Sequence, residues 1–306
     1  MAHDRHDHHH RDDAPVAFGA AFALGAALNI GFVAVEAVFG LAAGSMALLA
    51  DAVHNLGDVL GLLLAWGAAV LARRRPSARR TYGWGRGSII AANINAIVLL
   101  VGVGAIAMEA LRRLAEPAPV ASGVVMGVAA AGIVVNGLTA WMFARGHEDL
   151  NIRAAFLHMA GDAGVSAGIV VAALLIRLTG WGWLDPLASL LVAAVILAGT
   201  WGLLRDAANL AIDGVPAGIE HAAVVEYLRS LPGVIEVHDL HIWGLSTTET
   251  ALTAHLVHRA EVQPGEALVM HATVELGQRF RIGHATLQLE SEALADACRL
   301  RPAHVV

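Results

Sequence analysis

Two stretches of this sequence place a histidine and an aspartate four residues apart inside otherwise apolar runs. The first pair is His54 and Asp58, and the second is His158 and Asp162. Four residues make roughly one helical turn, so each pair is expected to project from one face of a helix. Two imidazoles and two carboxylates form a tetrahedral ligand set suited to a divalent metal such as zinc. We call these residues the His–Asp pairs, and they are the first candidates for a metal site.

The composition of the chain places these residues in a membrane. Of the 306 residues, 57% are hydrophobic and 15% are charged, a balance that indicates an integral membrane protein. Ionisable groups at membrane depth are costly unless partnered, so their default interpretation is functional. The 16 histidines favour metal chemistry, and the net charge of −6 gives no reason to expect a nucleic-acid partner.

Apolar runs of about twenty residues, the length that crosses a bilayer, recur along the first part of the chain. We expect six spans at residues 16–40, 45–72, 87–112, 120–144, 152–178 and 184–205. Arginines crowd the connection between the second and third spans, from Arg73 to Arg86. By the positive-inside rule this loop is cytoplasmic, and six spans then place both termini in the cytoplasm.

Asp51 lies three residues before His54, so Asp51, His54 and Asp58 share one stripe of the predicted helix. Asp51 is a candidate to orient His54 without binding the ion itself, or to carry protons to and from the site. The alternative is a hydrated residue near the outer end of the span.

The N-terminal tail, residues 1–15, alternates acidic residues with histidines and has no apolar period, which predicts disorder. Its histidines are candidates for loose metal capture: His3, His6, His8, His9 and His10. The alternatives are a solvated tail without function and part of an expression tag.

After the spans (residues 16–206) the composition becomes that of a soluble domain, predicted at 207–295 and followed by a tail at 296–306. Periodicity and turn residues predict helices at 217–231 and 264–280 and strands at 234–245, 249–258 and 285–290. An αββαβ order of this size implies a two-layer α+β sandwich with one sheet face covered by helices. The other face is left for a partner, water or metal.

This C-terminal domain carries a second set of possible metal ligands. The candidates are His238, His241, His255, His258, His271, His284, Gln288 and Glu290. Each single histidine is better explained as a hydrogen-bonded or exposed imidazole than as a ligand, but as a group they favour metal binding. The one cysteine, Cys298, excludes an intramolecular disulfide and a thiolate-rich metal site, and suits a cytosolic location.

Several motifs occur in a specific order. They are Leu48 to His54 with Asp58, Thr81-Tyr82-Gly83-Trp84-Gly85-Arg86, His158 to Asp162, Asp185-Pro186, Val237-His238-Asp239-Leu240-His241-Ile242-Trp243 and Ala285 to Glu290. In this order and spacing the chain resembles the cation diffusion facilitator family, in particular its bacterial zinc exporters. The resemblance covers nearly everything after the N-terminal tail.

The resemblance implies a homodimer of six-span protomers in the bacterial inner membrane, each with a metallochaperone-like, ferredoxin-like cytoplasmic domain. Family members exchange cytoplasmic zinc for protons, with zinc as substrate and regulatory ligand and with no organic cofactor. The transport ligands map onto the His–Asp pairs, and the cytoplasmic ligands onto His238, His255, His271 and Glu290. Gln288 stands where some members have a histidine ligand. Arg80 and Trp84 stand where others have loop histidines, which predicts that a loop metal site is absent.

Three functions remain open from the ligands alone. The first is proton-coupled efflux of zinc-like cations, the second is metal sensing without transport, and the third is an intramembrane metal hydrolase. A catalytic zinc usually has three protein ligands and an open position, whereas the His–Asp pairs supply four. The sequence also lacks an HExxH motif. We therefore expect a secondary transporter and not an enzyme.

Overall fold

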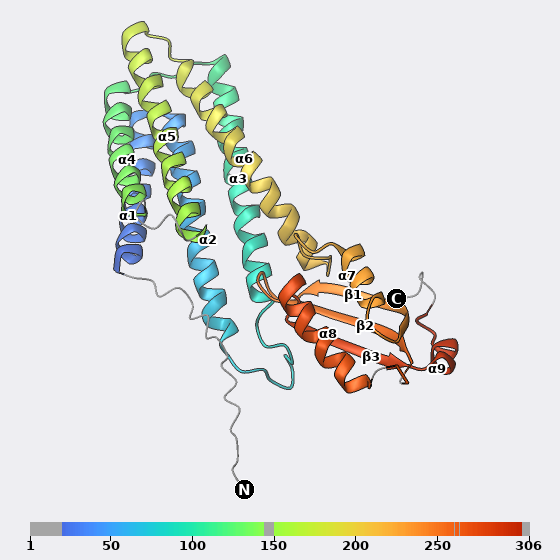
Figure 1. Ribbon diagram of the computed structural model, residues 1–306. Coiled ribbons are helices and arrows are strands. Elements are labelled where there is room, and N and C mark those ends of the chain that lie inside the picture. Colours follow the sequence, from blue (N-terminus) through green and yellow to red (C-terminus); the bar gives the residue numbers. More distant parts are fainter. Residues whose placement is uncertain (1–19, 144–149, 260, 263, 302–306) are drawn as a thin grey trace. The chain divides into compact units, whose positions relative to one another are not determined.

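The computed structural model describes residues 20–143, 150–259, 261–262 and 264–301 (Figure 1). The tail with His3, His6, His8, His9 and His10 lies outside the described residues. The chain forms two compact units. The first unit comprises Met1–Ala52 and Pro117–Ala188, and the second comprises Val53–Glu116 and Ser189–Val306.

The first unit is helical. It contains α1 (Ala20–Ala43), the start of α2 (Met46–Ala72), α4 (Ser122–Phe143), α5 (Leu150–Thr179) and the start of α6 (Leu184–Ala211). Helices α1, α4 and α5 run alongside one another (Figure 1). Its buried cluster brings Leu48 of α2 together with Ile169 and Ala173 of α5.

A hydrogen bond extends the contact between α2 and α5. The Ser166 hydroxyl of α5 donates to Asp51 Oδ2 of α2 at 3.2 Å. Leu48 shares a buried cluster with Ile169 and Ala173, whereas Asp51, one turn further along α2, meets Ser166, which lies before Ile169 on α5. The two helices are therefore antiparallel where they meet in the first unit.

The start of α2 is fixed by a buried carboxylate from α6. Asp185 Oδ1 accepts a hydrogen bond from the Ser45 hydroxyl at 2.5 Å, and Asp185 Oδ2 accepts one from the Met46 N–H at 2.6 Å. Free N–H groups and the helix dipole at an N-terminus favour negative charge there. Asp185 thus stabilises the first turn of α2 and sets where the helix begins.

The membrane part of the second unit consists of the rest of α2, α3 (Gly87–Ala115) and the rest of α6. Glycines allow α2 and α3 to approach closely, since a Cβ at Gly57 would lie 2.7 Å from Leu99 Cδ1 and one at Gly102 would lie 3.0 Å from Val53 Cγ1. The Asn93 amide of α3 donates to the Ala207 carbonyl of α6 at 2.9 Å.

Among the residues that the structure describes, five helices are long and apolar enough to cross a membrane by length and composition. They are Met46–Ala72, Gly87–Ala115, Ser122–Trp141, Phe156–Thr179 and Leu184–Ala211. They match the last five predicted spans. The first predicted span falls on α1, in which Ala27–Ala43 is a shorter apolar helix among the residues searched, so that span stays a prediction.

The C-terminal α+β domain belongs to the second unit. Its elements are α7 (His221–Arg229), β1 (Val234–Gly244), β2 (Thr250–His258), α8 (Gly265–Phe280), β3 (His284–Glu290) and α9 (Glu292–Ala297). The sheet order is β1-β2-β3, with β1 antiparallel and β3 parallel to β2 (Figure 1). The predicted α+β domain is confirmed, with strand ends within one residue of those expected.

Residue alternation along the strands separates the two faces of this sheet. Leu252 and Leu256 of β2 join a buried core with Leu228 of α7 and with Leu268 and Leu276 of α8. Helices α7 and α8 therefore cover one face. The residues between the core positions, such as His255, point to the other face.

Candidate metal centres

The first His–Asp pair lies on α2, in the second unit. The distance from His54 Nδ1 to Asp58 Oδ2 is 3.8 Å, and both side chains are only partly exposed. Ligand atoms about 2 Å from a tetrahedral zinc lie roughly 3.3 Å from each other. The helical spacing thus holds this nitrogen and oxygen near the separation that one ion requires.

The second pair lies on α5, in the first unit. The distance from His158 Nε2 to Asp162 Oδ2 is 3.7 Å, and the Asp162 side chain is 3% exposed. The predicted one-turn geometry is therefore present in both pairs. Because the pairs belong to different units, the convergence of all four side chains on one ion stays a prediction.

Asp51 is completely buried and accepts the hydrogen bond from Ser166. Its burial does not fit the alternative of a hydrated residue at the end of the span. The role of Asp51 in orienting His54 or in carrying protons stays a prediction.

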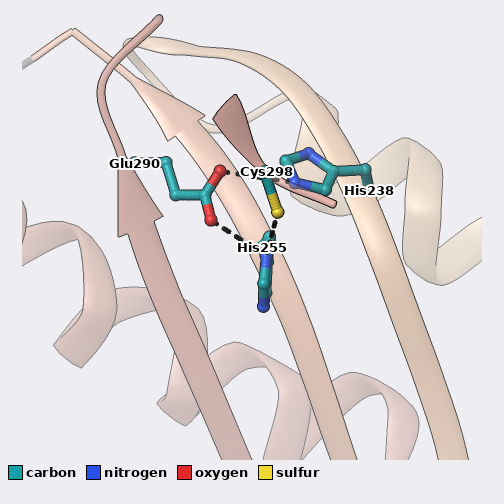
Figure 2. Close-up of side chains that lie close together, drawn as sticks. All are labelled: His238, His255, Glu290 and Cys298. Atoms are coloured by element: carbon teal, nitrogen blue, oxygen red, sulfur yellow. Dashed lines mark hydrogen bonds and ion pairs between the residues drawn. The ribbon is translucent and has the colours of Figure 1, made fainter. Parts of the chain in front are cut away.

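A second group of ligands lies in the C-terminal α+β domain. It consists of His238 on β1, His255 on β2, Glu290 at the end of β3 and Cys298 directly after α9. Each offers one ligand atom, and these atoms lie within 4.8 Å of one another. Figure 2 shows the four side chains gathered at one point beside the strands. We call them the C-terminal cluster.

Glu290 contacts both histidines of the C-terminal cluster. Its Oε1 is 2.9 Å from His255 Nδ1, and its Oε2 is 3.3 Å from His238 Nε2. Cys298 Sγ lies 3.8 Å from His255 Nδ1 (Figure 2). These separations are close to the edges of a tetrahedral metal site.

Burial shows that the cluster suits an ion. Glu290 and His238 are 3% and 8% exposed. Within the part of the chain that the structure describes, Glu290 Oε2 and both ring nitrogens of His238 make no hydrogen bond. Glu290 Oε2 and His238 Nε2 face each other at 3.3 Å. Buried polar atoms that make no hydrogen bond are costly, and a cation bound between these two would satisfy both. Two imidazoles, a carboxylate and a thiol are a donor set that zinc accepts.

Strand register explains how residues distant in sequence meet here. His238 pairs with His255 across β1 and β2, while Val257 pairs with Glu290 across β2 and β3. His255 and Glu290 alternate with core residues and therefore share the face away from α7 and α8. The short helix α9 then returns the chain so that Cys298 reaches His255.

A bulge in β1 brings one more carboxylate to this face. The register shifts between His238 and His241, and Asp239 has a left-handed φ of 47°. Asp239 Oδ1 is 2.8 Å from His241 Nε2, and Oδ2 is 3.5 Å from His255 Nε2. When an ion binds in the cluster through His255 Nδ1, the ring hydrogen must sit on Nε2, and Asp239 is the carboxylate that would favour it there.

Two predicted residues have other positions. His271 is exposed on α8, which packs on the opposite face of the sheet, so the structure does not bring it to the cluster. Gln288 lies beside the cluster, where its amide donates to Glu290 Oε1 at 2.7 Å. In the loop between α2 and α3, the Arg80 guanidinium stacks 3.8 Å above the Trp84 ring, and the predicted absence of a loop metal site stays a prediction.

Cys298 is the ligand candidate that the sequence reasoning missed. A single cysteine excludes a thiolate-rich site, but it does not exclude one thiolate among histidines and a carboxylate. The available signal was its position eight residues after Glu290, a distance that one short helix can span.

The comparisons with known proteins agree with this arrangement of helices and domain. Residues 22–210 match the cation efflux transmembrane domain, and residues 216–292 match the cytoplasmic domain of cation efflux proteins. The chain therefore belongs to the cation efflux, or cation diffusion facilitator, family. Its five long apolar helices and this membership make it an integral membrane protein with several spans.

Curated relatives match most of the chain. The zinc transporter ZitB of Escherichia coli (strain K12) is 39% identical over 86% of this chain and 84% of its own length. The cadmium, cobalt and zinc/H(+)-K(+) antiporter of Bacillus subtilis (strain 168) is 35% identical over 86% of each chain. The metal cation efflux system protein CzcD of Cupriavidus metallidurans is 34% identical over 92% of this chain and 89% of its own length.

Solved structures also match this chain, and one of them corresponds to its C-terminal part. The metal-bound C-terminal domain of the CzcD transporter from Cupriavidus metallidurans is 35% identical, and the match covers 24% of this chain and 99% of that domain, with a TM-score of 0.23.

Proposed function

We propose that the protein exports zinc-like divalent cations from the cytoplasm in exchange for protons. The substrate site consists of His54, Asp58, His158 and Asp162. The observation that carries the proposal is that two apolar helices each hold a histidine and an aspartate one turn apart, at 3.8 and 3.7 Å.

The contact between α2 and α5 supports a shared site. Asp51 and Ser166 meet where the two helices run antiparallel. Moving one turn further along α2 reaches His54, and moving one turn back along α5 reaches Asp162. If the antiparallel register continues, both His–Asp pairs lie at the same depth and face a common ion.

Ligand chemistry supports the coupling to protons. Zinc requires neutral imidazoles and ionised carboxylates, so binding displaces protons. Protons that arrive from the opposite side return these groups to forms that do not bind the ion and favour its release. Movement of α2 and α5 against the other helices would expose the site to each side in turn. Mixed nitrogen and oxygen ligands favour zinc, with cadmium, cobalt and iron(II) as further candidates.

The names of the relatives support metal export. They describe transport or efflux of zinc, of cadmium and cobalt, or of metal cations, and one names an antiporter that uses H(+) and K(+). We extend cation export to this chain. Helix α1 is then the first of six spans, and both termini lie in the cytoplasm. The membrane is the bacterial inner membrane.

We assign the C-terminal cluster to a regulatory zinc that is bound when cytoplasmic zinc is abundant, and we propose that the protein is a homodimer. His238, His255, Glu290 and Cys298 would hold this ion in one protomer. His271, on the opposite layer of the domain, would reach such an ion only from a second copy.

The alternatives fit less well. A hydrolase needs an open metal position for water beside a general base. The four ligands of the His–Asp pairs would occupy all four positions of a tetrahedral ion. A sensor without transport would bind the same ions but move none.

Flux in sealed proteoliposomes with an imposed pH gradient tests the proposal. We expect zinc uptake into the vesicles coupled to proton release, and its loss in Asp162→Ala. Asp206→Ala, which removes an exposed aspartate of α6, is the matched control and should transport normally. Zinc binding without flux in the wild type would support the sensor and contradict transport. Flux that persists in Asp162→Ala would contradict the site.

A further inference from the structure

One face of α2 continues past the first His–Asp pair toward the loop between α2 and α3. After His54 and Asp58, the positions at helical spacing on this face are Gly61, Ala65, Ala68 and Ala72. The face that carries the two predicted ligands therefore carries only small residues beyond them. These small side chains leave space along this face of α2, whereas other faces of the helix carry bulky side chains.

A cavity of about 480 Å³ follows this face. Its walls lie within the second unit. Helix α2 contributes Gly61, Ala65, Ala68 and Ala72 together with one bulky residue, Leu64. Helix α3 contributes Ser88, Ala92 and Asn95, the loop between β1 and β2 contributes Ser246 to Glu249, and Tyr82 and Leu203 complete the lining. A water-sized cavity needs a few tens of Å³, so this one admits an ion with several waters of hydration. We call it the α2–α3 cavity.

Asn95 marks the inner end of the α2–α3 cavity. It stands opposite Gly61, where a Cβ would lie 2.9 Å from Asn95 Nδ2. Asn95 Oδ1 is buried and has no hydrogen-bond partner among the described residues. Gly61 is three residues from Asp58, a rise of about 4.5 Å along the helix. Beyond Asn95, Leu99 packs against Gly57 and closes the space between α2 and α3.

The loop between β1 and β2 borders the mouth of the cavity and carries an exposed carboxylate, that of Glu249. The loop between β1 and β2 is attached to the start of α3, where the Thr247 N–H donates to the Ser88 hydroxyl at 3.0 Å. Glu249 is exposed in this loop and lines the cavity. The nearby cation Arg86 is paired with Asp213, so its charge is compensated.

We propose that the α2–α3 cavity is the cytoplasmic entry route for the cation and that Asn95 is a transient ligand on it. A partly hydrated divalent cation enters past Glu249, exchanges a water for the Asn95 amide oxygen, and moves one helical turn to Asp58. A neutral oxygen suits a transfer point, because it replaces hydration without holding the ion as a carboxylate would. This inference rests on the proposed function.

Asn93 provides a matched control for Asn95 on the same helix. Its amide donates to the carbonyls of Ile89 and Ala207, both at 2.9 Å, so its role is to join α3 to α6. In proteoliposomes we expect Asn95→Leu to raise the KM for zinc roughly five- to tenfold, the scale of one lost polar contact. Asn93→Leu should lower the melting temperature and leave the KM unchanged.

A plug tests the route independently of the amide. Ala65→Leu fills the cavity and is expected to reduce zinc flux at least about tenfold, while Gly67→Leu, at a position with open space around it, should not. Equal KM values in Asn95→Leu and wild type, or equal flux in Ala65→Leu and Gly67→Leu, would overturn the entry route while transport itself stands. Absence of flux in the wild type would overturn both the route and the proposed function.

Discussion

The two candidate metal centres are built in opposite ways. Each His–Asp pair comes from a single helix and is separated by one turn. The C-terminal cluster takes one residue from each of three strands and a fourth from the segment after α9. A helix fixes the distance between two ligands locally, whereas the cluster forms only when the sheet register and the path of the C-terminus are both correct.

The two candidate centres also differ in their donor atoms. The His–Asp pairs offer two nitrogens and two oxygens, which bind zinc and also respond to protons. The C-terminal cluster replaces one oxygen with sulfur, and a thiolate favours soft ions and tight binding. The first centre is suited to release its ion in every cycle, and the second is suited to hold one.

The largest expected effect separates the two centres directly. His158→Ala removes a proposed substrate ligand and should lower zinc flux about 100-fold or more. His255→Ala removes a member of the C-terminal cluster and should lower flux only severalfold, because the role proposed for this cluster is regulatory. Both are measured as initial rates in proteoliposomes at equal protein content.

The same two variants differ in zinc content. Full-length His255→Ala in detergent should lose one tightly bound zinc, and His158→Ala should keep it. If His255→Ala abolished flux as completely as His158→Ala, the division into a transporting and a regulatory centre would be wrong.

The next largest effect concerns the thiol. Cys298→Ser should weaken zinc binding at the C-terminal cluster roughly 10- to 100-fold, because a serine hydroxyl is a poor zinc ligand. Titration of the full-length protein with cobalt(II) gives a second signal, since a sulfur ligand produces a charge-transfer band in the near ultraviolet. A wild-type cobalt complex without this band would show that Cys298 lies near the ion without binding it.

A smaller effect is expected at Asp239, which touches His255 on the side away from the cluster. Asp239→Asn keeps the size of the side chain but removes the charge that favours the Nε2 hydrogen of His255. We expect about a tenfold loss of zinc affinity. His241→Ala leaves the contact between Asp239 and His255 in place and should change the affinity less. Equal losses in the two variants would assign the effect to the bulge as a whole.

The geometry of each His–Asp pair was predictable from the sequence, because residues four apart lie on the same face of a helix. Spans two to six and the three strands were also predictable, since membrane length and alternation leave clear patterns. The first span stays a prediction, because the described apolar part of α1 is short.

The C-terminal cluster was predictable only in part. His238, His255 and Glu290 followed from the family resemblance, but Cys298 and Asp239 did not. Cys298 depends on how α9 turns after β3, and Asp239 depends on a bulge that places a residue in the left-handed region without a glycine to signal it. His271 lies on α8, on the opposite layer of the domain, a position that its sequence does not reveal, and its role as a ligand stays a prediction.

The smallest expected effect tests how the C-terminal segment is held near the cluster. Arg301 contacts both carboxylate oxygens of Glu236 on β1, at 3.0 and 2.8 Å, and these hydrogen bonds hold the pKa of Glu236 below its ordinary value of 4.5. A depressed carboxyl pKa stabilises the fold above pH 4.5, and the contribution is lost as the pH falls through the lower folded-state pKa. Because the pair is partly exposed, Arg301→Ala should lower the melting temperature at neutral pH by only about 2 °C, and the difference should vanish in acid. Arg301 also pairs with Asp296 of α9, so Glu236→Gln should reproduce only part of the neutral-pH loss. A difference between Arg301→Ala and wild type that persists in acid would show that Arg301 acts through packing instead of charge.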